Sequence, residues 1–338
     1  MSGISSPGRV LTPGLDQHVT DRLVLCTLDG AADLLMEELR SLPSVHSIHQ
    51  LSSESVACTV DGRLSEIAAC SLYSTVAIAL HDDFLHPLEQ SGETGVLATL
   101  PSPIGFRVGC DDPGVRYSVI TAIERELRWI NQPGSWDVNL TRTAEGWIAE
   151  VGPLSWMRRF GRLERLPWST TPLVAEVLVR LAKLQPGQRI VDPFCGTGTI
   201  LLAALRRQPT ARVLGTDRDP RALAIADHNR QQLGRLAQAA AEALPYAAGT
   251  VDRIVTNLPF GKLVGTHHAN RTLYPAALSE INRVLTTDGR AVLLTEDKRL
   301  LHKAIEQQRG LKLARQRLLK YNGATPTAYV LARPRERR

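Results

Sequence analysis

The sequence predicts an α/β protein of two domains, the second of which is built on a parallel sheet covered by helices on both faces. The chain has 338 residues, enough for two domains of ~150 residues each. Over residues 169–338, short runs of Val, Ile and Leu alternate with amphipathic segments, a pattern typical of buried parallel strands joined by helices. Residues 21–151 mix strand-like and helix-like segments less regularly, which predicts a separate α+β domain.

The first domain follows a lead, residues 1–20, that is rich in Ser, Gly and Pro and lacks the apolar stretch of a signal peptide. Alternating apolar residues predict strands, apolar residues three or four apart predict helices, and Pro-Gly pairs predict breaks. On these criteria the elements are a strand over 21–30, a helix over 31–42, a hairpin over 44–62, a helix and a strand over 62–80, a strand at 106–110, a helix over 116–130, and strands at 136–141 and 146–152.

Residues 152–168 contain Gly, Pro, Trp and several Arg without clear periodicity, which predicts a linker between the domains. The second domain, 169–338, begins with a helix-like segment. Its expected strands and helices then alternate, with strands at 188–194, 211–217, 252–258 and 289–295 and helices at 198–208, 220–234 and 274–286. Ligands of such sheets bind beyond the carboxyl ends of the strands, so the residues just after these strands are the candidate site.

Composition limits the function classes. The chain is 43% hydrophobic and 22% charged, and no apolar run approaches the ~20 residues that span a bilayer, so a membrane role is not expected. Its five cysteines form no metal-binding or disulfide spacing, which predicts reduced thiols, a cytoplasmic protein and no metal. The sequence does not indicate an oligomeric state.

The net charge of +6 is unevenly distributed. Residues 1–150 contain 9 Arg and no Lys against 20 acidic residues, whereas residues 151–338 contain 31 Lys and Arg against 14 acidic residues. A basic region attracts polyanions through release of their counterions, so nucleic acid is the expected partner. Solvated helix faces remain the alternative explanation for many of these arginines.

Two acidic residues and a glycine turn are predicted to meet at the ligand-binding edge. Asp192 ends one strand, Gly196 and Gly198 follow it in "DPFCGTGT", and Asp217 ends the next strand in "VLGTD". Glycine lets a backbone approach a ligand closely, and a carboxylate in the second position can accept hydrogen bonds from ribose hydroxyls. The third glycine of a dinucleotide-binding motif is missing. The pattern therefore favours S-adenosylmethionine, whose ammonium group Asp192 would face.

The stretch "VTNLPFGK" at 255–262 ends another strand of the same sheet. Methylation of an amine whose lone pair is delocalised requires acceptors that draw the nitrogen toward a pyramidal geometry. We expect the Asn257 side-chain oxygen and a main-chain carbonyl at Leu258 or Pro259 to be these acceptors. Phe260 offers a face for base stacking, and Lys262 would meet a phosphate. A strand-ending turn with a buried ring is the structural alternative.

The quoted motifs, with "GTDRDPRA" and "LYPAALSEINRVLTTDGRAVLLTEDKRLL", resemble those of the amino-methylating class I methyltransferases. Within them, residues ~155–335 are most similar to the THUMP-domain RNA guanine-N2 methyltransferases that act on tRNA. The resemblance implies a Rossmann-like domain with a mostly parallel seven-stranded sheet. It also implies an N-terminal domain with a ferredoxin-like module and a weak THUMP-like domain, and direct in-line transfer of a methyl group to guanine N2.

The resemblance and the residue pattern together define three predicted sets. The catalytic set is Asn257, Leu258, Pro259 and Phe260. The cofactor set is Asp192, Pro193, Phe194, Cys195, Gly196, Thr197, Gly198, Thr199, Asp217, Arg218 and Glu242. The RNA-contacting set is Arg158, Arg159, Arg162, Arg165, Lys262 and Lys298, with an arginine patch in the first domain (Arg107, Arg116, Arg125, Arg128) as the alternative.

One departure from the family pattern leaves other functions open. The family usually has an acidic residue at the position of Ala240, where it contacts the adenine amine. Glu242 would replace it, or the backbone alone would hold the adenine. The alternatives are a methyltransferase acting on adenine N6, a protein glutamine or a small metabolite, and a non-catalytic RNA-binding protein.

Overall fold

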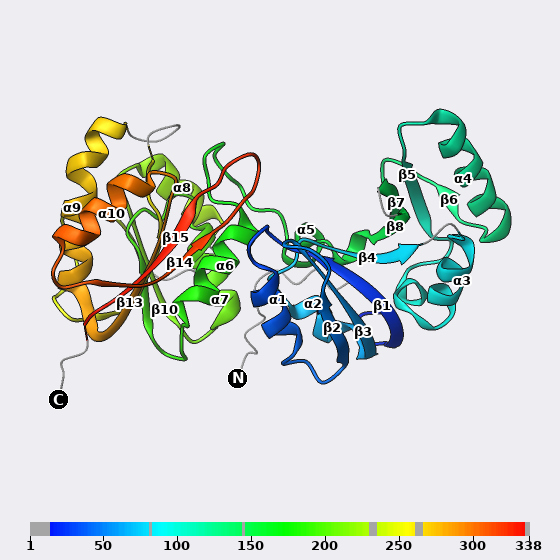
Figure 1. The fold of residues 1–338 in the computed structure, drawn as a ribbon, viewed down its shortest axis with the longest axis horizontal. Coiled ribbons are helices and arrows are strands. Elements are labelled where there is room, and N and C mark those ends of the chain that lie inside the picture. The colour runs from blue at the N-terminus through cyan, green and yellow to red at the C-terminus, as the bar shows by residue number, and fades with distance from the viewer. Residues whose placement is uncertain (1–13, 81–82, 144–145, 230–234, 261–265, 335–338) are drawn as a thin grey trace. The chain divides into compact units, whose positions relative to one another are not determined.

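The computed structural model describes residues 14–80, 83–143, 146–229, 235–260 and 266–334. The chain divides into two compact units, the first ending at Arg162 and the second beginning at Leu163. Figure 1 shows each unit as a sheet with its own helices. No helix among the described residues is long and apolar enough to span a bilayer.

The N-terminal unit contains one eight-stranded sheet with helices. Its elements are β1 (His18–Cys26), α1 (Ala32–Leu39), β2 (Val45–Gln50), β3 (Ser55–Arg63), α2 (Leu64–Ala69), β4 (Thr75–Leu80), α3 (Leu85–Thr94), η1 (Val96–Thr99), β5 (Gly105–Gly109), α4 (Pro113–Glu126), β6 (Ile130–Asn131), β7 (Val138–Thr143), β8 (Gly146–Val151), η2 (Gly152–Leu154) and α5 (Trp156–Phe160).

The first half of this sheet has the ferredoxin-like arrangement that the sequence predicts. Its elements run β-α-β-β-α-β, and its strands lie in the order β2-β3-β1-β4 with antiparallel neighbours. Alternation along β3 buries Val56, Cys58 and Val60 and leaves the residues between them partly exposed. These buried side chains, with Leu35 and Leu39 of α1, contribute to the core of the unit.

The second half continues the sheet in the order β8-β7-β5-β6, with β5 parallel to both β6 and β7. Helix α4 begins at Pro113, and its N-terminus is capped by the Asp112 carboxylate, which accepts hydrogen bonds from the amides of Gly114 and Val115. The interpretation of this half as a THUMP-like domain stays a prediction.

The C-terminal unit has a seven-stranded sheet in the order β11-β10-β9-β12-β13-β15-β14. Its elements are α6 (Pro172–Ala182), β9 (Arg189–Asp192), α7 (Thr199–Arg207), β10 (Arg212–Asp217), α8 (Pro220–His228), β11 (Arg235–Gln238), β12 (Val251–Asn257), α9 (His267–Val284), β13 (Leu285–Thr295), α10 (Lys298–Gln307), β14 (Lys312–Leu318) and β15 (Thr327–Ala332). The first five strands in the sheet order are parallel, and β15 pairs antiparallel with β13 and β14. This confirms the predicted mostly parallel, Rossmann-like sheet.

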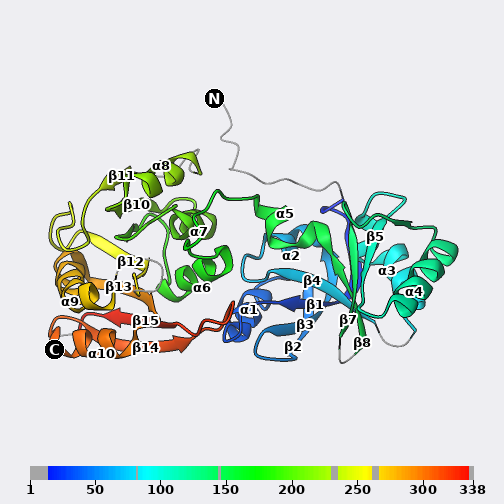
Figure 2. The ribbon, with the colours of Figure 1, turned by 90° about the horizontal axis from the view of Figure 1, so that it is seen from above.

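Helices cover both faces of this sheet, as Figure 2 shows, with α6, α7 and α8 on one face and α9 and α10 on the other. The second face is filled by apolar side chains that include Leu278, Ile281, Leu301 and Tyr329. Because both faces are covered, the central strands β9 and β12 are mostly buried, whereas β11 and β14 at the two ends of the sheet are more exposed. A ligand can therefore bind at the edge where the strands end. The strand order places the ends of β9, β10 and β12 together at that edge.

Candidate active site

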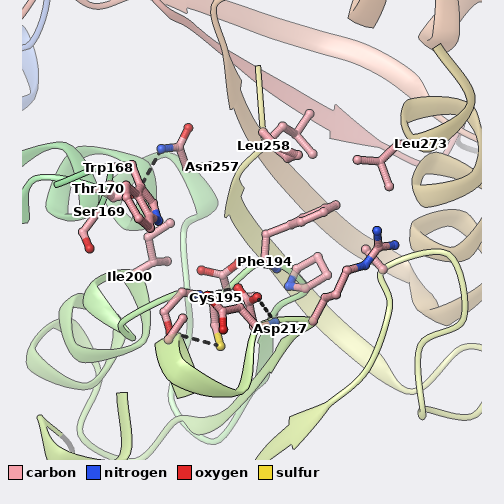
Figure 3. Close-up of a pocket in the computed structure, with 18 of the residues that line it drawn as sticks. Trp168, Ser169, Thr170, Phe194, Cys195, Ile200, Asp217, Asn257, Leu258 and Leu273 are labelled. Carbon is pink, nitrogen blue, oxygen red and sulfur yellow. Dashed lines mark hydrogen bonds between the residues drawn. The ribbon is translucent and has the colours of Figure 1, made fainter. Parts of the chain in front are cut away.

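A cavity of about 520 Å³ opens at the carboxyl ends of the parallel strands. Its lining comes from the segments that follow β9, β10, β11 and β12, from residues 166–170 before α6, and from the first turns of α9. Figure 3 shows Asn257 beside Thr170 and Trp168, with Asp217 and Cys195 deeper in the same cavity and Leu258 and Leu273 on the other wall. The two predicted halves of the site therefore share one cavity.

Most of the predicted site residues line this cavity. They are Asp192, Pro193, Phe194, Cys195, Gly196, Thr197, Thr199, Asp217, Arg218, Glu242, Asn257, Leu258, Pro259 and Phe260. Gly198 does not line the cavity and instead forms the N-cap of α7.

The glycine turn after β9 depends on positive backbone φ angles. Gly196 has a φ of +51° with no atom within 4 Å of where a Cβ would stand, and Gly198 has a φ of +80° in the left-handed region. The conformation, rather than the available space, requires glycine at 196. The turn therefore leaves room for a ligand next to its backbone, as the sequence predicts.

The Asp192 carboxylate is buried at the base of the cavity, and only one of its two oxygens accepts hydrogen bonds from described residues. Its Oδ1 accepts hydrogen bonds from the Thr256 hydroxyl at 2.6 Å and the Phe194 amide at 3.1 Å. Its Oδ2 is buried and has no partner. Burial raises the pKa of this carboxyl to about 7, against the opposing effect of the two hydrogen bonds. A cation placed at Oδ2 would restore the charged form.

Asp217 joins the end of β10 to the glycine turn. Its Oδ2 accepts a hydrogen bond from the Gly196 amide at 2.8 Å, and its Oδ1 accepts one from the Asp219 amide at 2.9 Å. Each oxygen keeps a second lone pair for a ligand hydroxyl. The backbone bonds fix the orientation of the carboxylate, which is what recognition of a ribose requires.

Glu242 and Arg218 form an ion pair at the outer part of the cavity. The Arg218 Nη2 lies 2.8 Å and 3.1 Å from the two carboxylate oxygens of Glu242. The Glu242 carboxylate is therefore already engaged by a guanidinium. It lines the cavity, but Arg218 competes for the oxygens that an adenine amine would need.

Asn257 presents an acceptor to the cavity. Its Nδ2 donates a hydrogen bond to the Thr170 hydroxyl at 3.1 Å, and its Oδ1 is buried without a partner in the part of the chain that the structure describes. The hydroxyl thereby orients the amide, and Figure 3 shows this contact as a dashed line. A buried acceptor that stays unpaired costs about 1–3 kcal/mol, so this oxygen points to a donor on a bound molecule.

The Pro259 carbonyl is occupied, contrary to one of the two expectations for the main-chain acceptor. It accepts hydrogen bonds from Asn270 Nδ2 at 2.6 Å and from the Tyr274 hydroxyl at 2.9 Å. The Tyr274 hydroxyl also lies 2.9 Å from the Thr295 hydroxyl. These contacts hold the turn after β12 in place, and the role of the Leu258 carbonyl as the main-chain acceptor stays a prediction.

Sequence reasoning missed the residues that reach the cavity from other elements. Leu166, Trp168, Ser169 and Thr170 precede α6, and Asn270 lies in the first turns of α9. The indole of Trp168 is 45% exposed at the cavity, which is unusual for so large an apolar side chain. A Trp next to three hydroxyl residues in "WSTTP" is the signal that would have pointed to this segment.

Cys195 lines the cavity but is buried. Burial, with the nearby carboxylates of Asp192 and Asp217, raises the pKa of its thiol far above the usual range. The Cβ of any residue replacing Gly215 would come within 3.0 Å of its sulfur. Both observations describe a tightly packed floor beneath the turn.

The structure contradicts the predicted RNA contact of Arg159. Its guanidinium is buried and donates hydrogen bonds to the carbonyls of Leu154, Ala68, Cys70 and Tyr73. Its Cζ also lies 3.7 Å from the centre of the Tyr73 ring. The short helix α5 turns this arginine inward, so it is not available to a phosphate.

The other predicted RNA contacts are differently placed. Arg158, Arg162 and Arg165 are exposed, and Lys298 is partly exposed at the start of α10. Arg158 donates a hydrogen bond to the Trp136 carbonyl at 2.7 Å. Lys262 lies outside the described residues. The exposed arginines keep their RNA role as a prediction.

Residues 167–325 match the UPF0020 family, described as an RMKL-like methyltransferase domain. Among curated proteins, the chain is 29% identical over 263 residues to the human "tRNA (guanine(6)-N(2))-methyltransferase THUMP3", covering 69% of this chain and 52% of the relative. It is 37% identical over 184 residues to the "tRNA (guanine(6)-N2)-methyltransferase" of Thermus thermophilus, covering 53% of each. The chain thus spans about half the length of these two relatives.

Among solved structures, TrmN from Thermus thermophilus superposes with a TM-score of 0.74 at 27% identity, covering 93% of this chain and 99% of that one. The similarity extends over both units and confirms the fold predicted from the sequence. The glycine turn and the strand order agree with the match of residues 167–325 to the UPF0020 family model of RMKL-like methyltransferase domains.

Proposed function

We propose that the protein is an S-adenosylmethionine-dependent methyltransferase that modifies the exocyclic N2 of a guanosine in tRNA. One observation carries this proposal: the unpartnered Asn257 Oδ1 and the carboxylates of Asp192 and Asp217 line the same cavity. An acceptor for an amine and the groups expected to hold a methyl donor therefore share one cavity, as direct transfer requires.

The residues of the cavity fit S-adenosylmethionine. The unpartnered Asp192 Oδ2 suits the ammonium of its amino-acid end, and the oriented Asp217 carboxylate suits its ribose hydroxyls. The glycine turn at 196 leaves the backbone open to the ligand. When bound, this cofactor supplies an electrophilic methyl group. Because Arg218 occupies the Glu242 carboxylate, we expect the backbone and apolar groups to hold the adenine instead.

The residues around Asn257 would orient the guanine amine. Asn257 Oδ1 and the Leu258 carbonyl would accept its two N–H groups, so that the nitrogen lone pair points into the cavity. Thr170 fixes the amide for this task. No general base is required, because the methylated, protonated amine is acidic enough to release its proton to water. Phe260 would supply a stacking surface for the base.

The choice of tRNA rests on the named relatives and on charge. Both relatives described above are named as tRNA guanine(6)-N2 methyltransferases, which makes position 6 the first position to test. The C-terminal unit, residues 163–338, contains 28 Lys and Arg against 14 acidic residues, and such a surface favours a polyanionic substrate. The proposal also places the protein in the cytoplasm, where tRNA is available.

Nucleoside analysis tests the proposal. The protein is incubated with methyl-labelled S-adenosylmethionine and one substrate, which is total tRNA, DNA or protein in three separate reactions. The methylated nucleosides or amino acids are then identified by mass spectrometry. We expect N2-methylguanosine from tRNA alone. N6-methyladenosine, methylglutamine in a protein, or binding of tRNA without any transfer would each replace the proposal with one of the alternatives left open by the sequence.

A further inference from the structure

Buried acceptors without a hydrogen-bond partner concentrate in the cavity. Among the described residues, four buried side-chain carbonyl or carboxylate oxygens have no partner: Asn131 Oδ1, Asp192 Oδ2, Asn257 Oδ1 and Asn270 Oδ1. The last three belong to residues that line the one cavity at the strand ends. Buried acceptors are almost always paired in folded proteins, so three in one cavity indicate a ligand that brings donors.

The contact with the Pro259 carbonyl determines which end of the Asn270 amide is the NH₂ group. Asn270 is fully buried, and one end of its amide lies 2.6 Å from the Pro259 carbonyl oxygen. A carbonyl can only accept, so the end that faces it must be the NH₂ group. The other end must then be the oxygen, which has no partner. Asn270 therefore has its unpartnered acceptor, Oδ1, at the end of the amide that faces away from the Pro259 carbonyl.

The proposed function accounts for two of the three acceptors, Asp192 with the ammonium of the methyl donor and Asn257 with the reacting amine. The third needs another donor near the amine. Guanine carries an N–H at ring position 1, directly next to the carbon that bears N2. Adenine has an unprotonated nitrogen at position 1, which is itself an acceptor and would face the Asn270 oxygen unfavourably.

We propose that Asn270 is a specificity-determining residue, because its Oδ1 accepts a hydrogen bond from N1–H of the target guanine. This inference rests on the proposed function. Because Asn270 also holds the Pro259 carbonyl, it connects recognition of the ring to the position of the turn that carries the amine acceptors. Purines without a hydrogen at N1 would leave the oxygen unpaired and would place two acceptors against each other.

A base analogue tests this without any change to the protein. 2,6-Diaminopurine keeps the amine at position 2 but has an unprotonated N1. We expect the wild-type protein to methylate tRNA that carries it at the target position with a kcat/KM about 100-fold lower than for guanine. Methylation of both RNAs within threefold would overturn the inference. If the guanine RNA itself were not methylated at N2, the proposed function would fail instead, so the two failures are distinguishable.

Two variants separate recognition from support of the turn. Asn270→Ala removes the acceptor and one hydrogen bond to Pro259, whereas Tyr274→Phe removes the other hydrogen bond to the same carbonyl, together with the contact to the Thr295 hydroxyl, and leaves the Asn270 acceptor in place. We expect both variants to lower the rate, but only Asn270→Ala to bring the guanine-to-diaminopurine ratio close to one. An unchanged ratio in Asn270→Ala would show a purely structural role. If that variant does not fold, the wild-type comparison still decides.

Discussion

The two units of the chain carry opposite charge. Residues 1–162 contain 12 Arg and no Lys against 20 acidic residues, a net charge of −8, whereas residues 163–338 have a net charge of +14. In the N-terminal unit, the buried Arg159 donates hydrogen bonds to four main-chain carbonyls of the same unit. The C-terminal unit, by contrast, has a cavity in which buried acceptors have no hydrogen-bond partner among the described residues.

This difference shows that a fold and its electrostatics are separate properties. The N-terminal unit has the ferredoxin-like strand order without the positive charge that phosphate binding requires. For the proposed RNA substrate, most of the attraction must therefore come from the basic unit, and the acidic unit can contribute shape rather than charge. The predictions below test this division of roles.

The largest expected effect comes from Asn257→Ala, which tests whether the chemistry resides in the basic unit. Removing the oriented acceptor should lower kcat for tRNA methylation by about 10³-fold, because donors and acceptors aimed at a transition state are each worth that order. Affinity for S-adenosylmethionine, measured by calorimetry, should change less than threefold. A similar loss of affinity would show that Asn257 holds the cofactor and not the base.

Arg159→Met should destabilise the acidic unit. It leaves four carbonyls without their buried donor, so we expect a loss of about 3–5 kcal/mol in the free energy of unfolding, measured with urea. The matched control is the neighbouring Arg158→Met, whose side chain is exposed and should cost less than about 1 kcal/mol. Equal and small losses would mean that the buried arginine is not structural and would reopen its RNA role.

Cofactor affinity should depend on pH through Asp192. The pKa of this carboxyl is raised to about 7, so its charged form becomes scarce as the pH falls below that value. Affinity for S-adenosylmethionine should weaken about tenfold per pH unit below 7 and level off above it. Asp192→Asn should bind more weakly at pH 8 and lose this dependence; retention of the same slope would assign it to another group.

The raised pKa of Asp192 predicts the opposite pH dependence for the stability of the protein without cofactor. Between pH 4 and 7 the folded protein holds a proton on Asp192 that the unfolded chain has released, so stability falls as the pH rises. The penalty is fully present above pH 7, and each pKa unit corresponds to about 1.4 kcal/mol. Asp192→Asn should therefore raise the thermal midpoint at pH 8 and change it little at pH 4.

The smallest effect tests the charge comparison directly. Arg162→Glu, at the boundary of the two units, should weaken tRNA binding several-fold and reduce the slope of log affinity against log salt by about 1. The control is Arg125→Glu on the acidic unit, where the arginine already pairs with Glu126. Equal effects of the two substitutions would show that the acidic unit also contacts phosphates.

The contiguous parts of the site could be predicted from the sequence. The glycine turn and the residues that end β9, β10 and β12 are adjacent in the chain to strands with an obvious apolar pattern. Because parallel strands end at one edge, the sequence order was enough to bring Asp192, Asp217 and Asn257 into one cavity. The fold followed from the same pattern and from the family resemblance.

The supporting residues could not be predicted, because only the fold brings them to the site. Thr170 is 87 positions before Asn257, and Asn270 reaches Pro259 from the next helix. Arg159 was misjudged for a related reason: in a segment without periodicity, nothing shows which of several arginines turns inward. Burial of a charged group depends on carbonyls from distant elements, here Ala68, Cys70 and Tyr73.

The packed floor beneath the glycine turn has a chemical consequence. Peroxides and alkylating reagents attack the thiolate form of cysteine, and burial keeps the Cys195 sulfur protonated at neutral pH. A thiol held in this form should react with such reagents more slowly than an accessible thiol, so we expect the glycine turn that packs on Cys195 to tolerate oxidants.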